Sequence, residues 1–134
     1  MLFEGKDRRE LERKIRQEGR LPPGQSLTLK WPVLYYGSVP PFDPETWEQG
    51  YTANIPVADL DRDEVLIATH HDGEPLSAEH GFPVRLIVPH MYAWKSVKWV
   101  RGFEFLDHNQ AGFWEQNGYH MYGDPWKEQR FSGK

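Results

Sequence analysis

The spacing of apolar and polar residues first predicts a short helix near the start of the chain. Asp7 followed by Glu10 is the arrangement of a capping box at the start of a helix, and Gly19 suits the end of one. We therefore expect a helix over residues 8–18. Its apolar side chains form only a narrow stripe, too small to enter a core. Residues 1–20 are expected to form a solvated helical arm.

Alternating apolar and polar residues predict short strands further along the chain. Residues 27–37 alternate and are interrupted by Pro32, which is typical of two short pieces of edge strand. Residues 51–56 and 97–106 alternate as well, and a glycine in the second segment predicts a bulge or bend. Residues 38–47 contain three prolines. They must run extended or turn over the surface, because proline cannot join a regular ladder.

Two mostly apolar runs predict buried strands. They are residues 64–69 and residues 82–89, the second of which is bounded by prolines. The Asp72–Gly73 dipeptide between them favours a tight hairpin turn, and residues 112–131 are too rich in glycine for a long helix. Together these elements indicate a strand-rich α+β domain that occupies residues 21–134.

Composition supports one small domain. The chain has 134 residues and a mass of 15.8 kDa, which suits a single compact unit. It contains no cysteine, so disulfides, thiolate metal sites and thiol catalysis are excluded within this chain. The longest apolar runs are far too short to span a bilayer, and the start of the chain has no apolar signal core. We expect a cytoplasmic protein without a membrane span.

Charge is unevenly distributed along the chain. The net charge of −4 argues against general nucleic-acid binding, and no nucleic-acid partner is expected. Residues 41–79 contain ten acids and one base, whereas residues 83–101 contain four bases and no acid. A short basic stretch on an acidic chain indicates a localised site for an anion.

His80, Arg85 and Lys98 are the first candidates for that site. Arg85 lies inside an apolar predicted strand, and leaving a buried guanidinium unpaired there costs several kcal/mol. Its partner is either a nearby carboxylate, as in a structural salt bridge, or an anionic ligand. Arginine offers a bidentate fork for phosphate, lysine offers a point charge, and Ser96 adds a hydroxyl.

Other polar side chains give weaker indications. His70 and His71 are adjacent, so on a strand they point to opposite faces and cannot readily ligate one metal. With no cysteine and no pair of histidines at ligand spacing, we assign no metal-ligating residue in this chain. Tyr119 lies between Gly118 and His120 in an expected loop. A packed surface aromatic and an active-site phenol are alternative interpretations of this tyrosine.

Two segments resemble a known family. HGFPVRLIVP at residues 80–89, followed by SVKWV at residues 96–100, resembles the molybdopterin-binding domain of the sulfite oxidase family, and especially its bacterial sulfite-oxidase-like members. Residues 22–47 and residues 112–131 are similar to the same bacterial group. The resemblance therefore covers almost the whole chain.

The resemblance implies a fold, a cofactor and the residues that hold it. The family has an unusual α+β fold, rich in short strands, and binds molybdenum through the dithiolene of a pterin, molybdopterin. By this resemblance, His80 and Arg85 contact the pterin or its phosphate. Ser96, Val97 and Lys98 line the same cofactor with backbone and side chain.

The resemblance also implies an activity. Tyr119, five residues after Trp114, is similar in placement to the active-site tyrosine that faces the metal. The implied protein is an oxidoreductase that transfers an oxygen atom at molybdenum. It acts on a small oxyanion or a sulfoxide and exchanges electrons with a partner that the sequence does not identify. The alternative is a non-catalytic remnant of the fold that keeps an anion site.

One difference from the family concerns the metal ligand. Family members carry a long block between the segments that resemble residues 38–47 and 51–56, and this block includes core strands and the cysteine that binds molybdenum. Here residues 47–50 join the two segments directly. Because no other residue type replaces a thiolate, the family's metal geometry cannot form within this chain. We therefore expect an incomplete version of the sulfite-oxidase-like fold.

Three explanations of the missing block stay open. The block is disordered and for that reason absent from this sequence, it has been deleted from the gene, or a partner chain supplies it. A true deletion would expose strand edges near Trp47 and Tyr51. Exposed edges of this kind favour association with another chain, including a second copy of this one.

Overall fold

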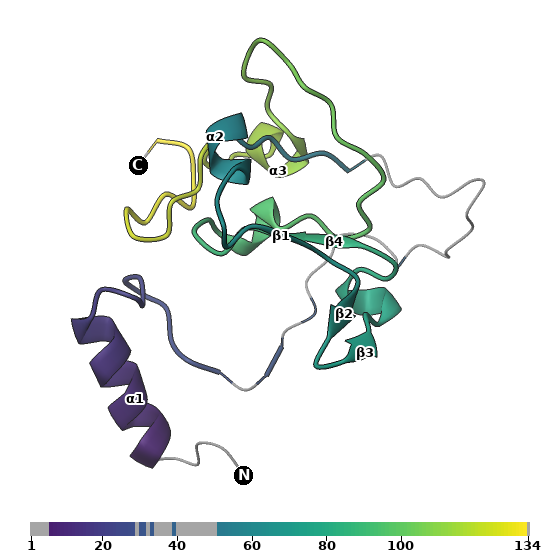
Figure 1. Ribbon diagram of the computed structural model, residues 1–134. Helices are drawn as coiled ribbons and strands as arrows, with labels where there is room; N and C mark the ends of the chain where they lie inside the picture. Colours follow the sequence, from purple (N-terminus) through teal and green to yellow (C-terminus); the bar gives the residue numbers. More distant parts are fainter. Residues whose placement is uncertain (1–5, 29, 32, 34–38, 40–50, 134) are drawn as a thin grey trace.

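Short helices and short antiparallel strands make up the fold in the computed structural model, which describes residues 6–28, 30, 31, 33, 39 and 51–133 (Figure 1). In chain order the elements are α1 (Lys6–Gln17), α2 (Val57–Leu60), β1 (Leu66–Ala68), β2 (His70–His71), β3 (Glu74–Pro75), η1 (Ala78–His80), β4 (Arg85–Ile87), η2 (Ala93–Lys95) and α3 (Phe113–Gln116), where η marks a 3-10 turn. Among these residues no helix has the length and apolar character needed to cross a membrane. The mixture is compatible with the α+β class, and the sulfite-oxidase-like arrangement stays a prediction.

Helix α1 confirms the helix predicted near the start of the chain, with slightly earlier ends. Gly19 follows it with a φ of 69°, the left-handed conformation that glycine often adopts just beyond a helix. In Figure 1, α1 lies apart from the strands. The indole Nε1 of Trp126 donates a hydrogen bond to the carbonyl oxygen of Gly19 at 2.8 Å, which ties the arm to the C-terminal segment. The division between an arm and a domain over residues 21–134 stays a prediction.

Two predictions of local geometry are confirmed. Asp72 and Gly73 have φ values of 50° and 81°, as a two-residue turn with two left-handed positions requires, and they join β2 to β3. The backbone N–H of Leu76 extends this hairpin by donating to the carbonyl oxygen of Thr69 at 3.0 Å. Residues 112–131 contain only the four-residue helix α3, in agreement with their glycine content.

Strand β4 confirms the buried strand predicted within residues 82–89. It pairs antiparallel with β1, with Arg85 opposite Ala68. On its other edge, the N–H of Leu86 donates to the carbonyl oxygen of Val97 at 2.8 Å. Because β4 has neighbours on both edges, it fixes the positions of the basic residues at its start and in the adjacent segment.

The apolar core is small and lies beside β4. Leu86, Val88 and Met91 are its buried members. Six half-buried side chains pack against them: Ile55, Leu60, Val65, Val97, Val100 and Tyr122. Most of the apolar support for β4 therefore comes from side chains that still contact water.

The prediction that residues 64–69 form a buried strand is wrong about burial. The strand exists as β1, but Leu66 is 56% exposed and Ile67 is 61% exposed. The described chain gives β1 a pairing strand but does not bury these two side chains, because burial also needs a second layer of residues.

The prediction of a strand over residues 97–106 is also wrong. Only its first part follows β4, where the N–H of Val100 donates to the carbonyl oxygen of Val84 at 2.9 Å. Trp99 has a φ of 53°, which interrupts an extended backbone. Residues 101–110 are exposed and irregular, since their backbone has no described ladder to join.

Two further strand predictions fail or lie outside the described residues. Residues 51–56 form no strand. The carbonyl oxygen of Thr52 instead accepts a hydrogen bond from the N–H of Phe113 at 2.8 Å, so this segment pairs with the start of α3. The described members of residues 27–37 are irregular as well. Most of residues 38–47, with their predicted extended course, lie outside the described residues.

Candidate functional site

His80, Arg85 and Lys98, which we call the cation cluster, come together around one tight turn. Gly81 has a φ of 115°. A Cβ atom on this glycine would lie 3.0 Å from the Cβ of Arg85 and 3.3 Å from the Cβ of Lys98. Only glycine suits both the backbone conformation and this close approach. The end of η1, the start of β4 and the segment after η2 therefore converge on the same place.

Arg85 is the most buried member of the cation cluster, at 9% exposure. Its Nη1 donates to the carbonyl oxygen of His80 at 3.0 Å, and its Nη2 lies 3.5 Å from that of Ser96. Its Nε is buried without a hydrogen-bond partner among the described residues. Burial lowers the pKa of Arg85, although a guanidinium remains charged at neutral pH. No described carboxylate forms an ion pair with it, so the salt-bridge alternative gains no support.

Lys98 and His80 add charge and hydrogen-bonding capacity. The Nζ of Lys98 donates to the carbonyl oxygen of Glu79 at 2.9 Å. Burial, and then the positive charge of Arg85, lower the pKa of Lys98, and the charge of Glu79 opposes part of this shift. The Nδ1 of His80 lies 2.8 Å from the Oγ of Ser77, while its Nε2 is buried and unpartnered among the described residues. Excess positive charge and unused ring and guanidinium nitrogens suit an anion.

Ser96 and Val97 lie beside the cation cluster but already bond to β4 and its continuation. The Oγ of Ser96 accepts a hydrogen bond from the N–H of Val88 at 2.9 Å. The backbone of Val97 pairs with Leu86, and its side chain packs against the core. Their positions agree with residues that border a site. Their contacts with a cofactor stay predictions.

Trp31 covers the cation cluster, a feature that the sequence did not indicate. Its ring stacks on the ring of His80, with centroids 3.8 Å apart and planes at 29°. The ring of His71 lies 4.5 Å from it on a tilt, and the Cζ of Arg85 is 5.5 Å from its centroid. The alternating pattern around Trp31 marks an apolar position, but nothing local connects that position to residues 40 or more places away.

Tyr119 lies in an aromatic cluster. Its ring centroid is 4.8 Å from that of Trp94, 5.2 Å from that of Trp114 and 5.2 Å from that of Phe131. Within the described residues its hydroxyl has no hydrogen-bond partner. None of these ring contacts is with the cation cluster, so the role of Tyr119 as an active-site phenol stays a prediction.

The sequence pattern also did not indicate a buried ion pair between Lys95 and Glu115. Both side chains are 0% exposed, and the Nζ of Lys95 lies 2.7 Å from the Oε1 of Glu115. The same Nζ donates to the carbonyl oxygens of Asn54 and Met121 at 2.8 and 2.7 Å. The Nε1 of Trp94 donates to Glu115 at 3.0 Å. Burial lowers the pKa of Lys95 and Glu115 opposes the shift. All these contacts are internal, so the pair is structural.

Within the described ranges no group of three or more histidines, cysteines, aspartates or glutamates is arranged to hold a metal ion. Asp59 is nevertheless shared by two donors, the Nε2 of His90 at 2.9 Å and the hydroxyl of Tyr122 at 2.8 Å. Burial and this hydrogen bond raise the pKa of Tyr122. Asp59, His90 and Tyr122 therefore connect α2 with two later segments. The expectation that this chain supplies no metal ligand stays a prediction.

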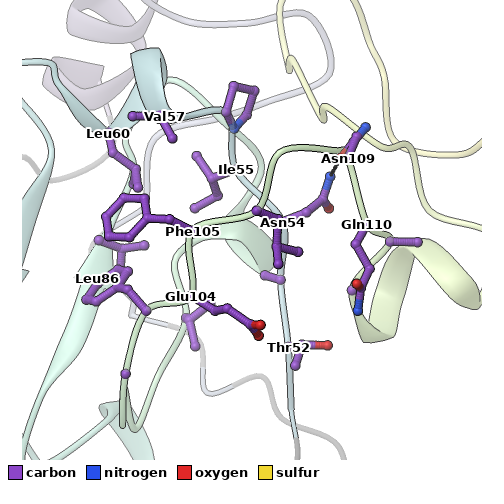
Figure 2. Close-up of a pocket in the computed structure, with 18 of the residues that line it drawn as sticks. Thr52, Asn54, Ile55, Val57, Leu60, Leu86, Glu104, Phe105, Asn109 and Gln110 are labelled. Atoms are coloured by element: carbon purple, nitrogen blue, oxygen red, sulfur yellow. Dashed lines mark hydrogen bonds between the residues drawn. The ribbon is translucent and has the colours of Figure 1, made fainter.

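A cavity of about 920 Å³ is lined by residues outside the cation cluster. Its lining comes mainly from residues 51–57 and 100–112. Figure 2 shows Phe105 beside Leu60 and Leu86, while Asn54 donates a hydrogen bond to Asn109 across one end at 2.7 Å. The cavity therefore opens directly onto side chains of the small core, and its lining does not include His80, Arg85 or Lys98.

Comparisons with known proteins agree with the motifs at the cation cluster. The family described as oxidoreductase molybdopterin binding domain matches residues 32–114. The chain is 55% identical over 85 residues to the uncharacterized oxidoreductase YuiH of Bacillus subtilis, which covers 63% of this chain and 43% of the relative. It is 42% identical over 71 residues to mitochondrial sulfite oxidase of Drosophila melanogaster, covering 52% of this chain and 12% of that protein.

A third relative is the putative protein-methionine-sulfoxide reductase subunit YedZ1 of Azospira oryzae. It is 27% identical over 73 residues, which cover 54% of this chain and 28% of the relative. No solved structure matches the chain. In each of these relatives the matched part is less than half of the protein, so the chain corresponds to only a portion of each.

Proposed function

Because the chain belongs to the oxidoreductase molybdopterin-binding domain family and is related to sulfite oxidases, we propose that its cation cluster binds the anionic part of molybdopterin. The function proposed for the complete protein is oxygen-atom transfer at molybdenum. When bound, the cofactor supplies the redox chemistry, while the protein binds and orients it.

One observation carries the proposal: a buried guanidinium has no carboxylate partner among the described residues. Arg85 keeps an unpartnered Nε, and His80 keeps an unpartnered Nε2. Lys98 adds a second positive charge next to Arg85. A phosphate group brings negative charge and several acceptor oxygens, which would satisfy these donors and compensate the two cations. Ser96 and Val97 would border the bound group.

The residues present do not fit the metal of the same cofactor. The chain has no cysteine, and the described residues hold no cluster of metal-ligating side chains. Carboxylates and imidazoles do not reproduce a thiolate ligand. We therefore assign the metal ligand to a cysteine-bearing segment outside this chain and derive no step at the metal from this chain alone.

Tyr119 is the proposed hydrogen-bond donor to the substrate. Its ring is held by Trp94, Trp114 and Phe131, while its hydroxyl has no partner among the described residues. A phenol oriented in this way can donate to an oxygen of a small oxyanion or a sulfoxide. Electrons would be exchanged with a separate protein partner, and a second copy of the chain is the other partner that we propose.

The second candidate function is a non-catalytic protein that keeps the anion site and has lost the metal. The absence of cysteine from the whole sequence favours it. Both candidates predict binding at the cation cluster. They differ in whether a thiolate supplied from outside restores turnover.

The test uses the 134-residue chain, purified and incubated with molybdenum cofactor, with and without a cysteine-bearing segment from a longer relative. Bound pterin, bound molybdenum and oxygen-atom transfer are measured separately. We expect pterin binding by the chain alone and turnover only with the added segment. Pterin binding without turnover, even with that segment, would identify the non-catalytic protein.

Arg85→Gln is the critical variant in this test. It should weaken pterin binding by about 2 to 5 kcal/mol, because it removes a buried charged partner of the ligand. Arg101→Gln is the matched control, since Arg101 belongs to the same basic stretch but is exposed. Equal pterin binding by Arg85→Gln and the unmodified chain would overturn the proposed function.

A further inference from the structure

The indole of Trp31 occupies one open side of the cation cluster. It stacks on His80 at 3.8 Å and lies 5.5 Å from the guanidinium carbon of Arg85. These contacts have the geometry of an aromatic pair and of a cation–π interaction. The outer part of Trp31 remains in water, because the residue is 40% exposed. The indole is therefore a thin cover over two of the three cluster residues.

The two terminal nitrogens of the Arg85 guanidinium already contact the chain itself. The Nη1 bonds to the carbonyl oxygen of His80 and the Nη2 lies near that of Ser96. Gly81 packs against the base of the side chain, where its Cβ position lies 3.0 Å from the Cβ of Arg85. The remaining Nε is buried and unpartnered among the described residues, and Trp31 is a side chain that contacts the same guanidinium.

We propose that Trp31 is a specificity-determining residue of the anion site. This inference rests on the proposed function, because it assumes that the cation cluster binds an anion. An anion can enter only when the indole moves away, and the stacking on His80 and the contact with Arg85 are then lost. A bare anion cannot replace those contacts. An anion that carries a planar ring can replace them, so the site selects phosphate esters of planar heterocycles over inorganic phosphate.

The size of the effect follows from the fraction of time for which the cover is open. The apparent dissociation constant equals the intrinsic one divided by that fraction. Aromatic contacts of this kind shift an equilibrium by about 2- to 10-fold. Removing the indole should therefore tighten the binding of inorganic phosphate by about 2- to 10-fold and lower the preference for a ring-bearing phosphate by a similar factor.

The experiment compares two probes, inorganic phosphate and guanosine 5′-monophosphate, by titration calorimetry. The proteins are the unmodified chain, Trp31→Ala, Trp31→Phe and Trp126→Ala, with folding checked by circular dichroism. Trp126 is a matched control because it is 41% exposed and bonds to Gly19 rather than to the cluster. We expect tighter phosphate binding and a reduced nucleotide preference only in Trp31→Ala. Trp31→Phe, which keeps a stacking ring, should resemble the unmodified chain.

Two other results have distinct meanings. If both probes bind but Trp31→Ala changes neither the phosphate affinity nor the preference, the role of Trp31 is refuted while the anion site stands. If neither probe binds the unmodified chain or Trp31→Ala, the anion site itself is refuted, and the proposed function fails with it.

Discussion

Arg85 and Lys98 are two positively charged side chains that lie close enough to repel each other, although burial already disfavours both charges. Burial lowers the pKa of both side chains, and the charge of Arg85 lowers that of Lys98 further. Arg85 donates to the carbonyl oxygen of His80 and Lys98 to that of Glu79, and the negative charge of Glu79 offsets only part of the lowering of the Lys98 pKa. Carbonyl dipoles compensate a buried charge less well than an opposite charge does. An anion bound here would relieve this unfavourable arrangement.

The lowered pKa of Lys98 predicts an unusual pH dependence of anion binding. As the pH rises, Lys98 loses its proton at a lower pH than an ordinary lysine does. Phosphate affinity should therefore begin to fall at a pH below the ordinary lysine pKa of about 10.4. Arg85→Gln removes one cause of the shift. It should weaken binding at every pH and move the decline to higher pH. Titration calorimetry between about pH 8 and pH 11 measures both effects.

Lys127→Met serves as the control for that measurement, because Lys127 is an exposed lysine outside the cation cluster. The phosphate affinity of Lys127→Met should decline at the same pH as that of the unmodified chain. A decline at the same pH in Arg85→Gln as in the unmodified chain would show that the charge of Arg85 does not act on Lys98.

At the scale of elements, the Lys95–Glu115 pair joins η2 to α3 and also reaches Asn54 in the segment before α2. The last residue of one short element is thus fixed to the third residue of another. Neither element is long enough to be stable alone. The buried pair therefore gives these elements their relative position.

Removing one member of this pair should cost more than removing both. Glu115→Leu leaves the ammonium of Lys95 buried without its carboxylate, and Lys95→Met leaves the carboxylate. Each change should lower the free energy of unfolding by about 3 to 5 kcal/mol. The double variant should lose less than the sum, because no unpaired charge remains. Urea unfolding measures the free energy of unfolding of all three variants. If the single variants fail to fold, a double variant that still folds would support the same conclusion.

The exposed pair Arg20–Glu18 gives the matched comparison. Its side chains are 70% and 40% exposed, so Glu18→Gln should change the free energy of unfolding by less than about 1 kcal/mol. Strict additivity of the Lys95 and Glu115 changes would contradict the assignment of these residues as a coupled buried pair.

Sequence patterns succeed in this protein where the cause of a structure is local. The turn at Asp72–Gly73 and the end of α1 at Gly19 depend on backbone preferences of those residues. The apolar neighbours of Arg85 predict the buried strand in which it lies, while the role of the cation cluster as an anion site stays a prediction. These features need few contacts with distant segments.

Patterns fail where the outcome depends on distant segments. Leu66 and Ile67 have the composition of a buried strand but remain exposed, because burial requires a covering layer. The contact of Trp31 with His80 and the Lys95–Glu115 pair join residues far apart in sequence. No spacing rule connects such residues before the chain is folded.

At the scale of the whole molecule, large apolar side chains remain in water next to the small core. Phe105 is 76% exposed, Ile67 61% and Val57 58%, and Phe105 and Val57 line the cavity of about 920 Å³. The relative YuiH is more than twice as long as its matched part, because this chain covers 43% of it. Large apolar side chains exposed around a cavity commonly mark an interface.

This surface predicts concentration-dependent association. Sedimentation velocity should show a rising mean mass as the protein concentration increases, because contact between copies removes exposed apolar side chains from water. Ile67→Lys and Phe105→Ser should each shift the association to higher concentration. Trp126→Ser, at an aromatic that is 41% exposed and lies outside the cavity lining, should not. A mass that stays constant over the whole concentration range would contradict this prediction.

The bond between Trp126 and Gly19 has a consequence for the motion of α1. It joins residues 107 positions apart, and one such hydrogen bond contributes about 1 kcal/mol. That is too little to couple α1 to the unfolding of β4. Backbone amides of α1 should exchange with deuterium through local opening, long before those of β4. We therefore expect the arm to detach and return while the cation cluster keeps its shape.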